Sequence, residues 1–251
     1  MIDLNMSEYI IREVRSQFKN PMVLWSGGKD STAMLHVIMQ TFGEVPFDVV
    51  FIETGFDFPE VIEFRDRIAR EWNLKLRIAR HETEVNLRTH GREACCYERK
   101  TVALKDIIHK YGYDAVIVGI RHDEQAIRSK ERFLSPRDRD FKWNYQDQPL
   151  ELIGWGIVFS DFPDADHVRV HPILHWTLLD VWEYIKKNNV PVNPLYFKGY
   201  TSIGCAPCTF AVSKPAKSVD EIIERVKAGM KERAGRLQDD AMQKLRALGY
   251  M

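Results

Sequence analysis

The sequence Ser-Gly-Gly-Lys-Asp-Ser at residues 26–31, here called the glycine loop, constrains the fold more than any other stretch of this chain. The apolar run 22–25 before it predicts a buried strand, and residues 32–39 after it predict a helix. A glycine turn between a strand and a helix directs backbone N–H groups and the positive end of the helix dipole at an anion. The lysine would add a point charge and the serines hydroxyl donors. We therefore predict a phosphate site; a plain turn is the alternative, and the spacing is not the Walker pattern.

Strands and helices alternate along the first half of the chain. After the first strand, three more are expected at residues 47–52, 74–78 and 114–119, and helices are expected near residues 9–14, 60–72 and 104–111. This alternation favours an α/β fold with a doubly wound, mostly parallel sheet. Ligands of such sheets bind at the carboxyl ends of the strands, where the glycine loop, Glu53 and Arg121 would meet.

The pattern changes after Arg121. Residues 121–166 mix basic and acidic side chains, which fits either a solvated loop or a loop that handles anions over a nucleotide. A short strand at 168–170 follows, and capping patterns at Thr177 and Ser218 predict two helices. We expect an α/β domain over residues 1–213 and a helical C-terminal extension, residues 214–251, packed on the same domain.

Composition narrows the class of protein. Lys and Arg total 36, as do Asp and Glu, so the net charge is zero, which weakens a nucleic-acid-binding role without excluding it. The N-terminus lacks the basic and apolar regions of a signal peptide, and no apolar run would span a bilayer. We therefore expect a cytoplasmic protein with no membrane contact, whose cysteines do not form structural disulfides.

All four cysteines fall in two pairs, Cys95 with Cys96 and Cys205 with Cys208. The second pair has the spacing of metal ligands. Adjacent side chains point to opposite faces of a strand, so the first pair could reach one metal centre only from a turn or a helix start. Four thiolates suit zinc or an iron–sulfur cluster, and spacing alone does not choose between them. Four inert, buried thiols are the remaining alternative.

Three resemblances cover nearly the whole chain. The glycine loop resembles the pyrophosphate loop of the N-type ATP pyrophosphatases, which cleave ATP between the α- and β-phosphates; this implies an adenine nucleotide alpha hydrolase-like fold that binds ATP or adenylyl sulfate. Residues 95–100 and 199–209 resemble the cluster motifs of the adenylyl-sulfate and phosphoadenosine phosphosulfate (PAPS) reductases, which hold a [4Fe–4S] cluster. The match extends through residues 193–196 and 233–236. Residues 128–139 and 248–250 are similar to the small, nucleotide-binding subunit of bacterial ATP sulfurylase, sulfate adenylyltransferase subunit 2.

Two departures from these families matter. The reductases carry a nucleophilic cysteine in a C-terminal segment, whereas this sequence has no cysteine after Cys208. Without such a thiolate, reduction of an adenylyl sulfate has no nucleophile. The sulfurylase subunit lacks the four cluster cysteines, so the chain matches neither family completely.

The resemblances favour an ATP pyrophosphatase that carries a [4Fe–4S] cluster and activates an acceptor for sulfur incorporation, as in nucleic-acid thiolation or DNA phosphorothioation. Sulfate adenylylation, or reduction of adenylyl sulfate or PAPS with a cysteine from another chain, are the alternatives. A nucleotide-binding subunit without turnover is an alternative of another class. The implied partners are a cysteine desulfurase or a GTPase subunit, with a nucleic acid as a candidate acceptor; association between copies of this chain is left open.

Residue roles follow from the charge that develops when the α-phosphate is attacked. Lys29 would neutralise the leaving pyrophosphate, Asp30 would bind Mg²⁺ or merely cap its helix, and Arg121 would meet the α-phosphate or a sulfate. Asp57 is a weaker candidate for metal or ribose, and His122 is the one histidine to test. The expected nucleotide-binding residues are Ser26, Gly27, Gly28, Lys29, Asp30, Ser31, Glu53, Gly119 and Arg121. The expected metal ligands are Cys95, Cys96, Cys205 and Cys208.

Overall fold

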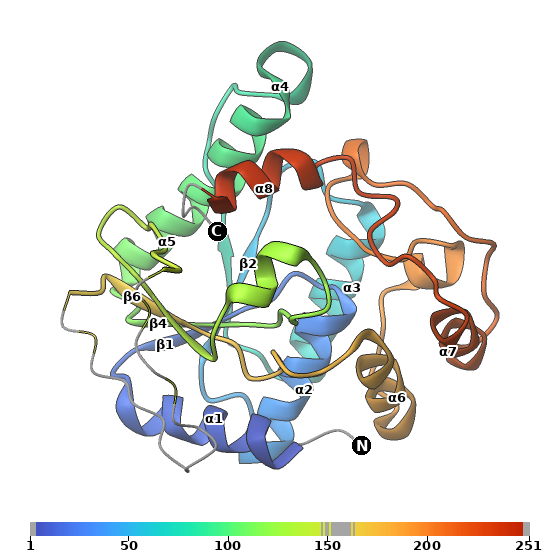
Figure 1. The fold of residues 1–251 in the computed structure, drawn as a ribbon, viewed down its shortest axis with the longest axis horizontal. Coiled ribbons are helices and arrows are strands. Elements are labelled where there is room, and N and C mark those ends of the chain that lie inside the picture. Colours follow the sequence, from blue (N-terminus) through green and yellow to red (C-terminus); the bar gives the residue numbers. More distant parts are fainter. Residues whose placement is uncertain (1–3, 147, 149–150, 152–161, 163, 248–251) are drawn as a thin grey trace.

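The structure is a computed structural model that describes residues 4–146, 148, 151, 162 and 164–247 (Figure 1). Its strands are β1 (Pro21–Leu24), β2 (Asp48–Ile52), β3 (Leu76–Ala79), β4 (Ala115–Val118), β5 (Leu134–Arg137) and β6 (His167–Val170). Its α-helices are α1 (Leu4–Gln17), α2 (Lys29–Phe42), α3 (Pro59–Glu71), α4 (Leu87–Cys96), α5 (Ala103–Tyr111), α6 (Leu178–Asn188), α7 (Val219–Lys227) and α8 (Asp239–Ala247). Shorter helical segments are the π-helical η1 (Tyr97–Val102) and the 3₁₀ segments η2 (Ala126–Lys130), η4 (Pro194–Lys198) and η5 (Ala206–Cys208).

The strands form one sheet in the order β3-β2-β1-β4-β6-β5. Every neighbouring pair is parallel except β5 and β6, which are antiparallel. The order reverses between β1 and β4, where Leu24 lies opposite both Val50 and Val118. The predicted doubly wound, mostly parallel sheet is therefore confirmed, and its topological switch point lies at the carboxyl ends of β1 and β4.

The segment 121–166 is only partly a loop. It contains η2 and the edge strand β5, neither of which was expected from its mixed charges. Residues 147, 149–150, 152–161 and 163 of this segment lie outside the described part of the chain. Leu134, Ser135 and Arg137 of β5 are buried, and the antiparallel register pairs Leu134 with Val170 and Arg137 with His167 of β6.

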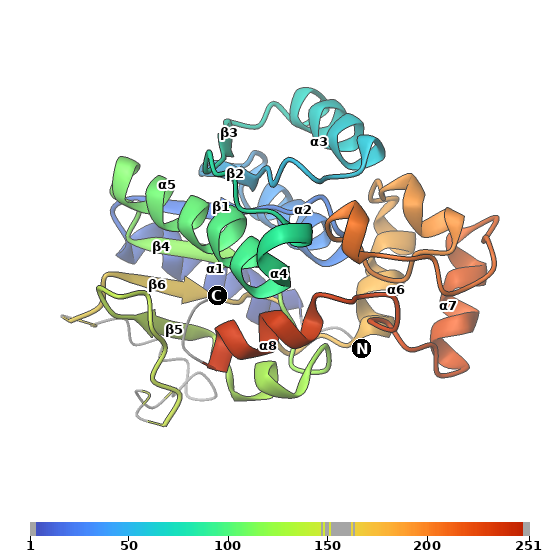
Figure 2. The ribbon, with the colours of Figure 1, turned by 90° about the horizontal axis from the view of Figure 1, so that it is seen from above.

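Helices cover both faces of the sheet, as alternation of side chains along the strands requires (Figure 2). Val23 and Ile117 point into the larger core, which includes residues of α1, α2, α3 and α6. Their neighbours Met22 and Val116 point into the smaller core, built with residues of α5. Near-continuous apolar strands are typical of a parallel sheet buried on both faces.

The C-terminal helices pack onto this sheet domain. Ile222 and Ile223 of α7 belong to the larger core. Met242 and Leu245 of α8 pack beside Cys96, so that α8 lies next to α4 (Figures 1 and 2). A boundary at residue 214 stays a prediction, and the predicted motif at residues 248–250 lies outside the described residues. No helix in the described part of the chain is long and apolar enough to cross a membrane.

The capping pattern at Thr177 is confirmed, because its hydroxyl accepts the Asp180 N–H and the Asp180 carboxylate accepts the Thr177 N–H. Ser218 likewise accepts the Glu221 N–H. The Glu221 carboxylate, however, accepts the N–H of Lys217, so the second cap is not reciprocal.

Thr177→Ala removes an acceptor from the first turn of α6 and should lower the free energy of unfolding by about 1 kcal/mol. Thr177→Ser keeps the hydroxyl and should lower the free energy of unfolding by only about a few tenths of a kcal/mol. Urea unfolding of both variants measures the difference. Equal losses in the two variants would show that the cap does not contribute.

Candidate functional site

The glycine loop runs from the end of β1 to the start of α2, as predicted. Gly27 has a φ of 70°, in the left-handed region that other residues rarely adopt, which explains a glycine at this position. The hydroxyls of Ser26 and Ser31 lie 3.0 Å apart, and the Ser26 N–H donates to the Ser31 hydroxyl at 3.2 Å. Tyr196 binds the loop from η4, because its hydroxyl accepts the Lys29 N–H at 2.9 Å.

The end of β4 approaches the loop so closely that it leaves no space for a side chain. A Cβ atom on Gly119 would lie 2.8 Å from the Cα atom of Ser31. Glycine therefore allows the two strand ends at the switch point to meet, with the loop between them. This backbone contact accounts for Gly119, although it assigns no ligand contact to it.

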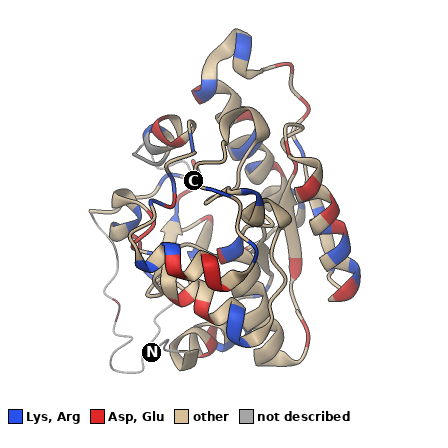
Figure 3. Ribbon diagram, turned by 90° about the vertical axis from the view of Figure 1, so that its right-hand side faces the viewer, with Lys and Arg blue, Asp and Glu red and all other residues tan. Residues whose placement is uncertain are grey.

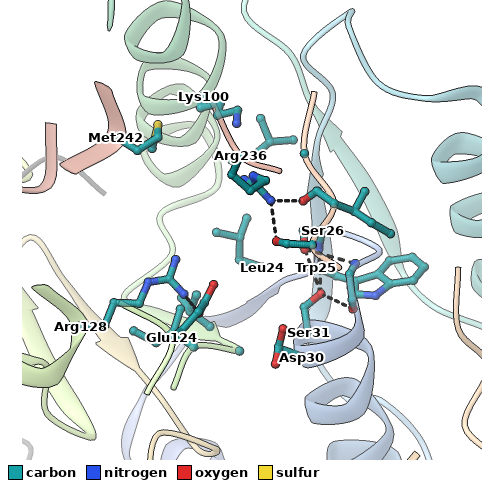
Figure 4. Close-up of a pocket in the computed structure, with 18 of the residues that line it drawn as sticks. Leu24, Trp25, Ser26, Asp30, Ser31, Lys100, Glu124, Arg128, Arg236 and Met242 are labelled. Carbon is teal, nitrogen blue, oxygen red and sulfur yellow. Dashed lines mark hydrogen bonds and ion pairs between the residues drawn. The ribbon is translucent and has the colours of Figure 1, made fainter. Parts of the chain in front are cut away.

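A pocket of about 270 Å³ opens at the switch point; we call it the central pocket (Figure 4). Its walls come from the glycine loop, the carboxyl ends of β1, β2 and β4, η2, η4 and the C-terminal segment 232–236. In Figure 4, Ser26 and Ser31 lie across the pocket from Arg128, while Lys100 and Arg236 lie above them. Glu124, which lies beside Arg128, also lines the pocket.

Lys29 and Arg121 are held in a buried cluster of charges beside the pocket. The Lys29 ammonium pairs with Asp30 at 2.8 Å and with Glu232. The Arg121 guanidinium pairs with Asp30, with Asp123 at 2.9 Å and with Glu232 at 2.7 Å. The side chains of Lys29 and Arg121 are 1% and 0% exposed, and neither residue lines the central pocket. Their charges are already matched by carboxylates, so the pocket owes little of its positive potential to them.

Other cations face the pocket. Arg128, Arg169 and Arg233 line it, and so do Lys100 and Arg236. In the described part of the chain, neither Lys100 nor Arg236 forms an ion pair with a carboxylate. Arg236 instead donates to the Ser202 hydroxyl at 3.0 Å and to the Ile203 carbonyl. Burial lowers the pKa of Arg236 to about 10, which still leaves it charged at neutral pH.

All four cysteines line one small cavity, which we call the cysteine cavity. Cys95 and Cys96 are the last residues assigned to α4, while Cys205 is the N-cap of η5 and Cys208 is its last residue. Gly91 breaks α4, and the backbone stays helical from there through η1 into α5, so the first pair lies in the opening turns of a helix, as expected. A helix allows both thiols to reach one side, because adjacent side chains on it are only about 100° apart.

The cysteine cavity adjoins the central pocket. Thr54, Lys100 and Cys205 line both, and the Cys205 thiol lies 3.5 Å from the Thr54 hydroxyl. Burial raises the pKa of the Cys96 thiol to about 11, with a smaller contribution from the other cysteines. Within the described residues, no group of three or more His, Cys, Asp or Glu side chains is arranged to hold a single metal ion. The metal-ligand role of the cysteines therefore stays a prediction.

Comparison with known proteins places the chain in a family. Residues 20–211 match the model of the phosphoadenosine phosphosulfate reductase domain. The chain belongs to this family. It is 34% identical to sulfate adenylyltransferase subunit 2 of Saccharophagus degradans, covering 97% of this chain and 94% of that protein, and 35% identical to the protein of the same name from Photorhabdus laumondii, covering 93% and 90%. Both resemblances drawn from the sequence, to the reductase family and to the sulfurylase subunit, are thereby confirmed.

Solved structures confirm the fold. The PAPS reductase of Candida auris superposes with a TM-score of 0.62 at 20% identity, covering 81% of this chain and 90% of that one. The FMN adenylyltransferase of Candida glabrata superposes with the same TM-score at 19% identity, covering 98% and 79%. The adenine nucleotide alpha hydrolase-like fold predicted from the sequence is therefore correct.

Of the other residues predicted for the site of this PAPS reductase family member, one lines the central pocket and two contact other parts of the protein. Asp57 lines the central pocket and accepts the Thr54 N–H at 2.8 Å. Glu53 does not line the pocket and pairs with Arg65 at 2.7 Å, and His122 lies against the Glu131 carbonyl. Their roles toward a nucleotide stay predictions.

The sequence alone assigned no role to several residues that shape the site. Glu232 and Arg236 come from the C-terminal segment, Lys100 follows the first cysteine pair, and Tyr196 comes from η4. Three of them lie inside the quoted family motifs, at 95–100, 193–196 and 233–236, so the motifs marked the segments but not the contacts. Glu232 directly precedes the last of these motifs.

Two buried histidines lie on and near the β6 wall of the pocket. The His171 Nδ1–H donates to the Arg132 carbonyl at 2.7 Å, and His167 lies 3.0 Å from Asp166. Burial lowers the pKa of each to about 4. Both are therefore neutral in the folded protein at pH values where the unfolded chain binds a proton.

Because these pKa values are depressed, the unfolded state binds more protons between about pH 6.5 and pH 4. The free energy of unfolding should therefore fall as the pH is lowered through this window, by on the order of 3 kcal/mol per histidine at its lower end. His171→Gln keeps a donor for the Arg132 carbonyl and should flatten the curve. Denaturant unfolding from pH 7 to pH 4.5 measures how steeply the free energy of unfolding changes with pH in the wild type and in His171→Gln. Identical slopes would contradict the depressed pKa of His171.

Proposed function

We propose that this chain is an adenylyltransferase of sulfur metabolism, which binds ATP, transfers AMP to an acceptor oxygen and releases pyrophosphate. One observation carries the proposal: the glycine loop faces a pocket at the switch point, and Lys100 and Arg236 line this pocket without carboxylate partners among the described residues. Its membership of the PAPS reductase family and its similarity to sulfate adenylyltransferase subunit 2 support the same class of chemistry.

The leaving pyrophosphate would bind to the glycine loop. The N–H groups of Ser26, Gly28 and Lys29 already donate within the protein. The other N–H groups of the loop, the Ser26 and Ser31 hydroxyls and the positive end of the α2 dipole would face the phosphate where negative charge develops. Mg²⁺ would neutralise further phosphate charge, and the carboxylates of Asp30 and Asp57 in the pocket wall are oxygen ligands of the kind it prefers. Lys29 and Arg121 would act through Asp30, which they hold in place.

The acceptor would approach from the side of Lys100 and Arg236. Two cations that the described residues leave without an ion-pair partner suit an anionic acceptor oxygen, such as that of a phosphodiester or a sulfate. Buried walls such as Trp143 and Ile120 would exclude water and so limit hydrolysis of the activated acceptor.

Cys95, Cys96, Cys205 and Cys208 would hold a [4Fe–4S] cluster. Such a cluster takes one thiolate per iron, so four thiols that surround one cavity fit its ligand set. Burial raises the pKa of the Cys95 thiol, and the nearby charges of Arg99 and Lys100 oppose part of that rise. When bound, the cluster would add folding energy and a redox-capable centre beside the acceptor.

Sulfur incorporation is the function we favour for this cysteine-bearing member. With all four thiols at one cavity, an external donor, most simply a persulfide on a cysteine desulfurase, would supply the sulfur. Sulfate adenylylation with a partner GTPase subunit is the second candidate, and the similarity to subunit 2 proteins over 97% of this chain favours it. On the side shown in Figure 3, basic and acidic residues are interspersed, and the sequence has no net charge, so a nucleic-acid acceptor would be recognised mainly at the pocket.

The purified protein should convert ATP to AMP and pyrophosphate when its acceptor is present. The assay supplies ATP and Mg²⁺ with either sulfate, or DNA and tRNA together with a cysteine desulfurase and labelled cysteine. Incorporation of label into nucleic acid supports sulfur insertion, and adenylyl sulfate formation supports the second candidate. Ser31→Ala removes a donor from the glycine loop and should lower kcat/KM about tenfold or more.

Other products would contradict the proposal. Release of ADP and phosphate would show that ATP is cleaved between the β- and γ-phosphates and not between the α- and β-phosphates. Sulfite formation from adenylyl sulfate and thioredoxin would restore reduction as the activity. ATP binding without turnover under every condition would favour a non-catalytic nucleotide-binding subunit.

Anaerobically purified protein should be brown and contain about four irons per chain. Cys95→Ser, Cys96→Ser, Cys205→Ser and Cys208→Ser should each lose iron and lower the thermal midpoint, because bound metal contributes to folding. Thr101→Ser, a change close to the first pair that leaves the thiols intact, is the control. Zinc in place of iron in the anaerobic protein would refute the cluster.

A further inference from the structure

Glu232 joins three parts of the chain that are far apart in sequence. One carboxylate oxygen binds the Lys29 ammonium at the start of α2, and the other accepts from Arg121, just after β4, at 2.7 Å. Its backbone carbonyl accepts the Thr201 hydroxyl at 2.6 Å. Glu232 is therefore held in place through both its side chain and its backbone.

The contact is buried and charged on both sides. The Glu232 side chain is 9% exposed, and its two cationic partners are almost fully buried. Those cations hold the Glu232 pKa down to about 2, so the carboxylate is charged at any physiological pH. A buried carboxylate with two cationic partners is strongly tied to one place, because no other position would compensate its charge.

The residues that follow Glu232 form a wall of the central pocket. Arg233 lines the pocket and pairs with Glu124 and Asp239. Arg236 lines it on the side of Lys100. The segment 232–236 contains no α-helix or strand of its own, only the isolated bridge between Thr209 and Arg236. Backbone hydrogen bonds attach its far end to residues 208–210, since the Phe210 N–H donates to the Gly235 carbonyl at 3.0 Å. At its near end, the contacts of Glu232 attach it to the strand ends at the switch point.

We propose that Glu232 is a positioning residue: its carboxylate fastens segment 232–236 to the ends of β1 and β4, and thereby holds Arg236 against the bound nucleotide and acceptor. Only the identity of the ligand rests on the proposed function. The fastening itself would exist whatever reaction the pocket carries out.

The test compares Glu232→Gln with Glu224→Gln. The first keeps the shape of the side chain and removes its charge. The second makes the same change at an exposed residue of α7 that pairs with Lys227 at 3.2 Å. Trypsin cleavage after Arg233 and Arg236 should become about tenfold faster or more in Glu232→Gln, while cleavage after Arg225 and Lys227 in α7 stays unchanged. Glu224→Gln should behave as the wild type after Arg233 and Arg236.

A double-mutant cycle tests whether Glu232 acts through Arg236. Calorimetric titration with Mg·ATP should show about tenfold weaker binding for both Glu232→Gln and Arg236→Lys, and the double variant should be little weaker than either single one. This readout needs no turnover, so a failure of the proposed reaction would leave it intact. If Glu232→Gln does not fold, Glu232→Asp, which shortens the reach but keeps the charge, replaces it in both assays.

Two results would overturn the proposal. Unchanged cleavage after Arg233 and Arg236 would show that Glu232 does not fasten the segment. Additive losses of Mg·ATP affinity in the double variant would show that Glu232 and Arg236 act independently.

Discussion

A buried cluster of charges at the switch point of the sheet holds this site together. Lys29 and Arg121 share the carboxylates of Asp30 and Glu232, and both cations are almost completely withdrawn from solvent. Removing one member of such a cluster leaves an uncompensated buried charge, which costs roughly 3–5 kcal/mol. The cluster therefore fixes the glycine loop, the end of β4 and the C-terminal segment relative to one another, and the central pocket lies between them.

The basic residues at the site fall into two groups, those that belong to the buried cluster and those that line the pocket. The cations nearest the glycine loop are neutralised by carboxylates, so backbone N–H groups and serine hydroxyls are left to bind phosphate. Lys100 and Arg236 line the pocket and form no ion pair with a carboxylate in the described part of the chain. Lys100, Thr54 and Cys205 border both cavities, so a ligand in the central pocket and any group held by the cysteines would lie on either side of the same three residues.

Local sequence patterns predicted the sheet well, because they depend on residues close in the chain. The apolar run before residue 26, the glycine turn and the cap at Thr177 were each found where expected. The edge strand β5 was missed, since its pairing with β6 is not local and its charged residues resemble a loop. Arg137 of that strand is buried against Glu131, a pairing that no periodicity indicates.

The sequence by itself determined the class of fold, the place of the glycine loop and the grouping of the cysteines in two pairs, because each of these depends on residues that are close together in the chain. It did not determine which side chains face the pocket. Lys29 was expected to meet phosphate, yet it meets Glu232, which lies 203 residues further along the chain. Only tertiary packing brings such residues together, and burial then decides the outcome, since a cation removed from water pairs with the nearest carboxylate.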